Sequence, residues 1–443
     1  MKYKIGFVSL GCPKNLTDTE TMAGLLKESC EIVTDPKEAD IIIVNTCGFI
    51  ESAKEESINT IIEMGQYKEN GRLKKLIATG CLAQRYTEEI LEQLPEVDAV
   101  VGTGSYYEIK QIIEELENGG KVVRKNDIDA DIPDNLPRSK ATARYTAYLK
   151  IADGCDNKCT YCIIPKLRGK YRSRTVENII NEATRLAAEG TTELILIAQD
   201  TTVYGTDLYK EYMLPFLVQK LSELEGLKWI RLHYCYPESV TDELINVIAE
   251  NDKVCKYIDI PFQHASDAVL KRMGRKSTYE KNIELIKKLR ERVPGIIIRS
   301  TFIVGFPGET KSDFNILKKF IMESEIDRAG VFEYSPEEDT PAAKMKDQIP
   351  EEVKTARKNE LMALQSRIAY ANNKKKIGSK ILVLCEEKAN ENIYIGRSEG
   401  DSPEIDNKII FKGKNVNIGE YIYVRITSAA EYDLEGEVCE SGK

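Results

Sequence analysis

Blocks of apolar residues alternate with helix-like segments along the first third of the chain. Helical spacing of apolar residues is clearest at residues 19–27 and 53–64, and a further helical stretch runs to about residue 117. This βαβα alternation predicts an α/β fold with a doubly wound parallel sheet in residues 1–124. The apolar runs expected to form its strands are residues 5–8, 41–44, 76–78 and 99–102.

A polar, acidic segment with two prolines, residues 125–140, is expected to be a linker. Strand and helix patterns then resume over residues 141–375, where amphipathic segments such as 176–188 separate the strands and a long charged helix, about 351–375, follows. Six strand–helix units predict a partial, TIM-like (β/α)6 barrel, with a site in the loops at the carboxyl ends of its strands. The strands are expected to begin near residues 146, 193, 229, 257, 296 and 330.

The last segment, residues 376–443, has a different pattern. Its apolar runs are short, turn residues separate them, and no helical spacing is visible, which predicts a small, closed, OB-like all-β barrel. The segment holds nine Lys and Arg against thirteen Asp and Glu, and an acidic barrel suits a basic protein partner better than RNA. The runs are residues 381–384, 393–395, 409–411 and 421–426.

Composition narrows the class of protein. The chain has 443 residues, of which 30% are charged and 42% hydrophobic, an ordinary globular mixture. The longest run without a charged residue, 41–50, is well short of the roughly 20 apolar residues of a membrane span. The first residues lack the apolar core of a signal peptide, so we expect a cytoplasmic protein without a membrane segment. The net charge of −9 disfavours a protein that binds nucleic acid through its whole surface.

Three of the eleven cysteines form a compact motif, Cys155, Cys159 and Cys162, on a loop that follows a predicted strand. Thiolates are the ligands of iron–sulfur clusters, and three ligands leave one iron of a four-iron cluster open. The open iron would chelate the amino and carboxylate groups of S-adenosylmethionine, whose reductive cleavage gives a deoxyadenosyl radical. The alternatives are a structural zinc site with a distant fourth ligand and three unrelated core thiols.

Cys12, Cys47 and Cys81 are dispersed, but each follows an apolar run and adjoins a glycine. The carboxyl ends of parallel strands meet at one edge of a sheet, so these three thiols should converge there. The glycines would let the backbone approach a bulky ligand. This predicts a second three-thiolate cluster, and the alternative is that all three are free thiols in the core.

Other candidates for ligand contacts are less distinctive. Tyr161 lies within the cysteine loop and could flank an adenine, whereas Gly305 and Gly308 lie on a turn that either approaches S-adenosylmethionine or is only a tight turn. Arg168 follows the cysteine loop, where it would stabilise anionic clusters or be solvated. No residue is assigned a catalytic role beyond the cluster ligands.

These motifs resemble, over the entire chain, those of the radical S-adenosylmethionine methylthiotransferases. The matching positions are Gly-Cys-Pro-Lys-Asn at residues 11–15, Val-Asn-Thr-Cys at 44–47, Thr-Gly-Cys at 79–81, the cysteine loop, Ile-Pro at 164–165, Arg-Gly at 168–169, Ser-Arg at 173–174, the turn at 305–310 and the terminal barrel, which looks like a TRAM domain.

The resemblance implies two 4Fe-4S clusters, an auxiliary one on Cys12, Cys47 and Cys81 and a radical-generating one on Cys155, Cys159 and Cys162. It also implies two S-adenosylmethionine molecules: one gives a methyl group to sulfur held at the auxiliary cluster, and the other gives the radical. A low-potential electron donor such as flavodoxin or ferredoxin would supply the electron.

Two substrates compete within this family. One branch modifies an adenosine of tRNA and tends to carry Gln-Met between the first cysteine and the asparagine. The other modifies the β-carbon of an aspartate in ribosomal protein S-twelve, free or in the small subunit. Pro13 and Lys14 and the acidic barrel resemble the second branch, which we expect. The remaining alternatives are a tRNA adenosine methylthiotransferase and a non-catalytic iron–sulfur electron carrier or RNA-binding scaffold.

Overall fold

The N-terminal part of the chain forms a six-stranded sheet covered by helices. Our description comes from a computed structural model of the protein and is given for residues 3–440. The strands are β1 (Lys4–Ser9), β2 (Glu31–Val33), β3 (Ile41–Thr46), β4 (Lys75–Gly80), β5 (Ala99–Val101) and β6 (Val122–Arg124). The helices are α1 (Pro13–Leu26), η1 (Pro36–Glu38), α2 (Glu51–Gly65), α3 (Tyr67–Asn70), α4 (Cys81–Arg85), α5 (Thr87–Gln93), η2 (Tyr106–Glu108) and α6 (Ile109–Glu117).

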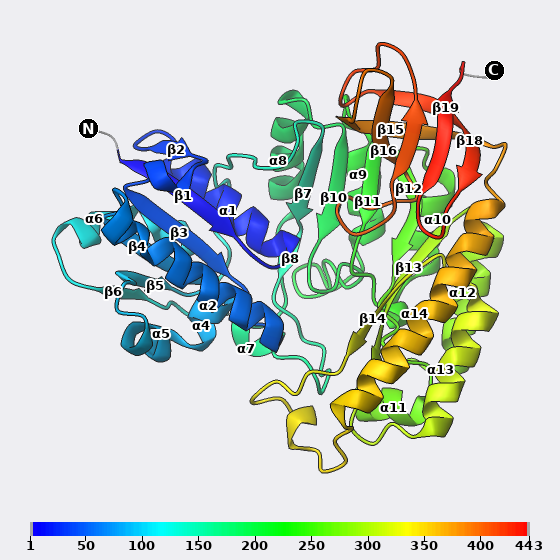
Figure 1. Ribbon diagram of the computed structural model, residues 1–443, viewed down its shortest axis with the longest axis horizontal. Coiled ribbons are helices and arrows are strands. Elements are labelled where there is room, and N and C mark those ends of the chain that lie inside the picture. Colours follow the sequence, from blue (N-terminus) through cyan, green and yellow to red (C-terminus); the bar gives the residue numbers. More distant parts are fainter. Residues whose placement is uncertain (1–2, 441–443) are drawn as a thin grey trace.

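This N-terminal sheet is parallel throughout and has the order β2-β1-β3-β4-β5-β6 (Figure 1). Successive side chains of β3 face opposite cores, because side chains alternate along a strand. Ile41 and Ile43 pack with α1 and α6. Ile42 and Val44 pack with α2 and α5. Helices therefore cover both faces, which confirms the predicted doubly wound sheet.

Two strands and the start of one helix differ from the sequence prediction. The edge strands β2 and β6 have three residues each, and each holds a charged residue, so neither has a recognisable apolar run. Helix α1 begins at Pro13 rather than near residue 19. A proline in the first turn favours helix initiation because its φ is already fixed near the helical value.

The central part is an open parallel sheet of six strands in the order β14-β13-β12-β11-β10-β7, as the sequence predicts for a partial (β/α)6 barrel (Figure 1). Strands β7 and β14 are its two edges. The strands are β7 (Thr146–Lys150), β10 (Glu193–Ile197), β11 (Trp229–Leu232), β12 (Val254–Asp259), β13 (Ile297–Val304) and β14 (Arg328–Glu333), and a separate ribbon pairs β8 (Ala152–Asp153) with β9 (Arg172–Ser173).

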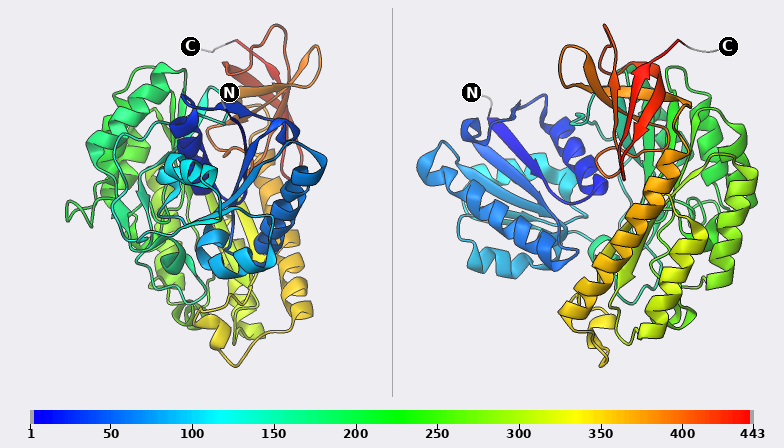
Figure 2. Two further views of the ribbon diagram at one scale, coloured as in Figure 1. Left: turned by 90° about the vertical axis from the view of Figure 1, so that its left-hand side faces the viewer. Right: turned by 45° about the vertical axis from the view of Figure 1, so that its right-hand side comes forward.

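Helices pack around this sheet and form one large core with it. The last of them, α14, runs along the outside from the lower end of the molecule up to the C-terminal barrel (Figure 2). They are α7 (Ile164–Arg168), α8 (Val176–Ala188), α9 (Leu214–Ser222), η3 (Pro237–Ser239), α10 (Asp242–Glu250), α11 (Asp267–Arg272), α12 (Tyr279–Arg292), α13 (Lys311–Ser324), η4 (Ala342–Lys344) and α14 (Glu351–Lys374).

The C-terminal segment is a closed five-stranded barrel, as predicted, in the order β15-β16-β17-β19-β18. The sequence pattern missed one strand, β19, because charged residues alternate with its two buried positions, Leu434 and Gly436. Its strands are β15 (Lys380–Lys388), β16 (Ile393–Ser398), β17 (Ile409–Lys412), β18 (Tyr421–Ala429) and β19 (Leu434–Val438).

The C-terminal barrel packs against the amino-terminal ends of the central strands. Arg397 of β16 donates hydrogen bonds to both carboxylate oxygens of Glu193, the first residue of β10. Glu193 also accepts a hydrogen bond of 3.0 Å from Arg231. Burial alone would raise the pKa of Glu193, but the guanidinium groups of Arg397 and Arg231 outweigh it and lower the pKa to about 2.

None of the helices within residues 3–440 combines the length and the apolarity that crossing a membrane requires. The domain boundaries after residues 124, 140 and 375 stay predictions.

The buried Arg397–Glu193 pair predicts how firmly the barrel is attached. Replacing Arg397 by Met leaves a buried carboxylate with fewer partners, so we expect the free energy that holds the barrel in place to fall by about 3 kcal/mol. Pulse proteolysis across a urea series, with fragments that end near residue 376 as the readout, measures this loss. Lys412→Met, which removes an exposed pair with Glu437 at 3.9 Å, is the control and should change it by less than about 1 kcal/mol. Equal effects of the two substitutions would contradict the conclusion that the Arg397–Glu193 pair attaches the barrel to the central sheet.

Candidate active site

The three dispersed cysteines lie at the carboxyl ends of neighbouring strands, as predicted. Cys12 follows β1 and precedes α1, Cys47 follows β3, and Cys81 is the first residue of α4, directly after β4. In this strand order β2 lies on one side of β1, and β3 and the later strands lie on the other side. Ligands of open α/β sheets bind at such a switch point, which here lies between β1 and β3. The three thiols therefore occupy the edge of the sheet where a ligand site is expected.

Glycine allows these loops to come close together. Gly11 has φ +86, and a Cβ atom there would lie 2.8 Å from the Cβ of Cys47 and 3.0 Å from its Sγ. Any side chain at this position would displace Cys47. Burial raises the pKa of the Cys81 thiol to about 12 and also raises the pKa of Cys47. Metal binding at these thiols would therefore release protons.

Cys155, Cys159 and Cys162 lie on the loop between β8 and α7. Backbone hydrogen bonds fix the loop: Cys155 N donates to Gly169 O at 3.1 Å, and Cys162 N donates to Cys159 O at 3.1 Å. Burial raises the pKa of Cys155 to about 11. The Sγ of Cys159 lies 3.2 Å from the hydroxyl of Tyr236.

Five of the six cysteines line one cavity of about 360 Å³ between the N-terminal and central sheets; they are Cys12, Cys47, Cys81, Cys155 and Cys162. Cys159 and Cys155 line a second opening, of about 480 Å³. In the part of the chain that is described, neither triplet has the spacing of a single metal ion's ligands. Each triplet, one from the N-terminal part and one from the central part, offers three cysteine sulfurs. Thiolate sulfur is the ligand that iron–sulfur clusters require, so the chemistry of these residues fits two such clusters.

Two cavity-lining residues have strained backbones. Tyr234 has φ 58 and Gln263 has φ 69, a left-handed conformation that non-glycine residues rarely adopt and that is enriched at functional sites. The buried Oε1 atoms of Gln263 and Gln199, which also lines the cavity, have no hydrogen-bond partner among residues 3–440. The cavity thus presents acceptors for a ligand with N–H or O–H groups. The sequence pattern did not single out these residues, although each follows one of the predicted strands within a few positions.

The residues predicted to contact S-adenosylmethionine lie in different places. Tyr161 lines the cavity, and its ring meets that of Phe306 edge to face at 6.5 Å. Gly305 and Gly308 lie on the turn after β13 and are not among the residues that line this cavity. A Cβ atom on Gly305 would lie 2.2 Å from Cγ of Lys354, so Lys354 occupies the space beside it. The role of the two glycines toward S-adenosylmethionine stays a prediction.

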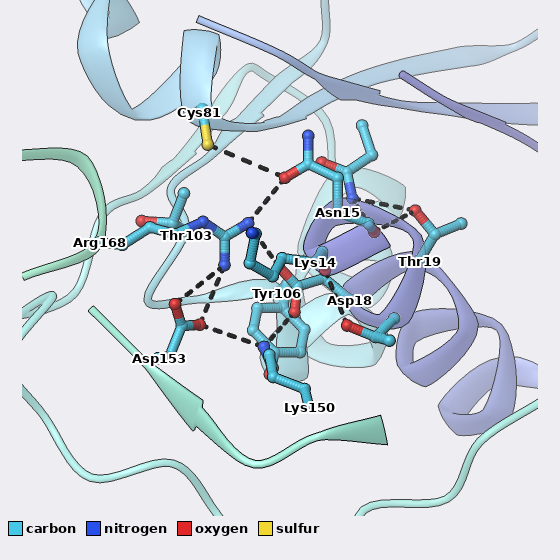
Figure 3. Close-up of polar contacts among 12 residues, drawn as sticks. Lys14, Asn15, Asp18, Thr19, Cys81, Thr103, Tyr106, Lys150, Asp153 and Arg168 are labelled. Atoms are coloured by element: carbon cyan, nitrogen blue, oxygen red, sulfur yellow. Dashed lines mark hydrogen bonds and ion pairs between the residues drawn. The ribbon is translucent and has the colours of Figure 1, made fainter. Parts of the chain in front are cut away.

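A buried ion network joins the two sheets beside the cavity (Figure 3). Arg168 of α7 donates to Asp18 of α1 at 2.9 Å and to both oxygens of Asp153. Lys150 of β7 bonds the same two carboxylates. All four side chains are at most 7% exposed. Arg168 is therefore not a solvated surface residue, which was one of the two alternatives that the sequence left open. The other alternative, that it stabilises anionic clusters, stays a prediction.

Asn15 of α1 connects this ion network to the thiols. Its Nδ2 donates to Leu10 O and Thr46 O, both at 3.0 Å, and so ties the ends of β1 and β3 together. Its Oδ1 accepts 2.7 Å from Arg168 and lies 3.8 Å from the Sγ of Cys81. Burial has the larger effect on the pKa of Cys81 and raises it, and the positive charge of Arg168 partly offsets that increase.

Known proteins resemble this chain in sequence and in the order of its three parts. Sequence models match residues 4–102 (Uncharacterized protein family UPF0004), 149–321 (Radical SAM superfamily) and 377–439 (TRAM domain). A Clostridium perfringens protein named ribosomal protein uS12 methylthiotransferase RimO is 54% identical over 440 residues, which are 99% of this chain and 98% of that protein. The chain belongs to the RimO family.

A second relative supports the same family, and a solved structure supports the fold. A protein of the same name from Clostridioides difficile is 52% identical and covers 98% of both chains. The solved structure of the radical S-adenosylmethionine methyltransferase TsrM from Kitasatospora setae matches with a TM-score of 0.56 over 77% of both chains; at 16% identity it supports the fold alone.

RimO-family membership confirms the expected enzyme class, a radical S-adenosylmethionine methylthiotransferase, which implies one 4Fe-4S cluster and S-adenosylmethionine. The tRNA-modifying alternative is not favoured.

The ion network predicts a loss of stability when Arg168 is removed. Arg168→Met leaves Lys150 as the one ion-pair partner of two buried carboxylates among residues 3–440, and breaking a buried ion pair in this way costs about 3–5 kcal/mol. Urea unfolding followed by hydrogen exchange in α1 measures the loss. Lys170→Met, which changes a residue with a 79% exposed side chain two positions away, should cost less than about 0.5 kcal/mol. An Arg168→Met protein as stable as this control would show that the network does not hold the two sheets together.

Proposed function

We propose that this chain methylthiolates the β-carbon of an aspartate in ribosomal protein uS12, which is also called ribosomal protein S-twelve. The observation that carries the proposal is the single cavity lined by cysteines of both triplets. A C–H bond at a saturated carbon has no acidic proton, so acid–base catalysis is of little use there. A radical source and a sulfur donor must instead face the same carbon atom. The substrate is inferred from the relatives, which are named as ribosomal protein uS12 methylthiotransferases.

In this proposal, Cys155, Cys159 and Cys162 hold the radical-generating 4Fe-4S cluster, and Cys12, Cys47 and Cys81 hold an auxiliary one. When bound, the first cluster supplies the electron that cleaves S-adenosylmethionine to a deoxyadenosyl radical, and the second supplies the sulfur. The chain's own residues provide the enclosure. Asn15 and Arg168 hold the loops of the auxiliary site, and Tyr161 forms part of the wall between the two triplets.

The second opening, beside Cys155 and Cys159, suits the approach of a low-potential electron donor such as flavodoxin or ferredoxin. It reaches two cysteines of the radical-generating site from outside the shared cavity, so an electron could enter while substrate occupies that cavity. Because ribosomal proteins are made and assembled in the cytoplasm, the proposal also places the enzyme there.

Mass spectrometry of uS12 tests the proposal. After anaerobic incubation with reconstituted enzyme, S-adenosylmethionine, sulfide and a reductant, we expect a methylthio group on one aspartate. The triple variant Cys155→Ala, Cys159→Ala, Cys162→Ala should form neither product nor deoxyadenosine. The matched variant Cys12→Ala, Cys47→Ala, Cys81→Ala should still form deoxyadenosine but leave uS12 unmodified.

Two results would contradict the proposal. The first is unmodified uS12 when the wild-type enzyme forms deoxyadenosine, which would mean that free uS12 is the wrong substrate or an incomplete one. The second is loss of all iron from either triple variant, which would mean that the two cysteine triplets do not form independent sites.

A further inference from the structure

Lys14 places a buried positive charge in the shared cavity. It is the second residue of α1, two positions after Cys12, and only 7% of it is exposed. It lines the same cavity as cysteines of both triplets. Figure 3 shows it at the start of α1, beside the network of Arg168.

The contacts of Lys14 leave its charge unmatched. Its Nζ lies 3.4 Å from the carbonyl oxygen of Ala198 and 3.3 Å from the centre of the Tyr234 ring. No carboxylate of residues 3–440 forms an ion pair with it. An ammonium group is rarely buried without a counter-ion, because removing its hydration is costly.

The other two cations of the cavity differ from Lys14 in this respect. Arg168 is paired with Asp18 and Asp153, and Arg299 lies 2.8 Å from Asp259. Among the cations that line this cavity, Lys14 is thus the one that no carboxylate of residues 3–440 pairs with, which leaves it available to an anionic ligand. An ammonium offers three N–H donors, and a carbonyl oxygen and a ring face do not use all of them.

The proposed function brings two carboxylates into the cavity. The carboxylate of S-adenosylmethionine would be chelated, together with its amino group, by the open iron that the motif of three cysteines predicts. The side-chain carboxylate of the substrate aspartate has no such partner. We infer that the Lys14 ammonium binds this substrate carboxylate, an inference that rests on the proposed function.

This contact would fix the reacting carbon. The β-carbon of aspartate is bonded directly to the carboxylate carbon, so holding the carboxylate restricts where its hydrogen atoms can point. The aromatic ring of Tyr234 fixes the ammonium in turn by a cation–π contact. Lys14 also offsets the repulsion that thiolate-ligated clusters exert on an anionic substrate in a cavity of low dielectric constant.

Binding measurements that vary enzyme and substrate together test this inference. Fluorescently labelled uS12, carrying either the target aspartate or asparagine in its place, is titrated with reconstituted holoenzyme and S-adenosylmethionine, without reductant so that no turnover occurs. Wild-type enzyme should bind the asparagine protein about 10- to 100-fold more weakly, as expected for a lost charged hydrogen bond. Lys14→Met should bind both proteins with equal affinity, within about twofold.

Three further variants serve as controls. Lys14→Arg keeps the charge and should retain part of the preference for aspartate. Lys166→Met removes a lysine with a 59% exposed side chain on the nearby helix α7 and should keep the full preference. Lys14→Gln, neutral but polar, replaces the methionine variant if that protein fails to fold or to load iron, and it should also lose the preference.

Each contrary outcome is distinct. If Lys14→Met still prefers aspartate as strongly as the wild type, Lys14 does not bind the substrate carboxylate. If that variant loses affinity for S-adenosylmethionine while its preference for aspartate is unchanged, the ammonium serves the cofactor instead. If the wild-type holoenzyme binds neither form of uS12, the proposed function itself fails and the inference fails with it.

Discussion

The cavity of this enzyme depends on four buried charges. Asp18 on α1, in the N-terminal part of the chain, pairs with Arg168 and Lys150 of the central part. The same two cations pair with Asp153, and all four side chains are nearly inaccessible to water. Each charge compensates the desolvation of the others, so removing one leaves the opposite charges with only one ion-pair partner in the network. One cysteine triplet belongs to the N-terminal part and the other to the central part, so the network that joins these parts also holds the two triplets relative to one another. Asn15 extends it directly to the loops of Cys12, Cys47 and Cys81.

The cysteines lie beyond the carboxyl ends of the strands, whereas the C-terminal barrel packs against the amino ends of the central strands. The C-terminal barrel is attached at the amino ends through Arg397 and Glu193, and the cysteines lie at the other ends. A further contact of the barrel reaches toward the cavity, since Asp406 lies 3.4 Å from Arg299, which lines it. The fold thus attaches the C-terminal barrel mainly at the ends of the strands that lie away from the cysteines.

Much of this arrangement could be predicted from the sequence. The apolar runs locate most strands, and a cysteine immediately after a strand must lie at one edge of a parallel sheet. The polar residues of the cavity could not be predicted in the same way. Asp18 and Thr19 are buried on α1, so the helix has no clean apolar face, and their partners come from other parts of the chain. Likewise, a lysine beside a cysteine is usually solvated, and only the packing of Lys14 against Tyr234 shows that it is buried.

The central claim of this account is that radical and substrate meet in the cavity between the two triplets. Isotope transfer tests it most directly: uS12 is labelled with deuterium at the β-carbon of aspartate, and the deoxyadenosine formed during turnover is analysed by mass spectrometry. The account predicts that deuterium passes from uS12 into deoxyadenosine as the methylthio product accumulates. Product formation with deoxyadenosine that contains no deuterium would contradict it.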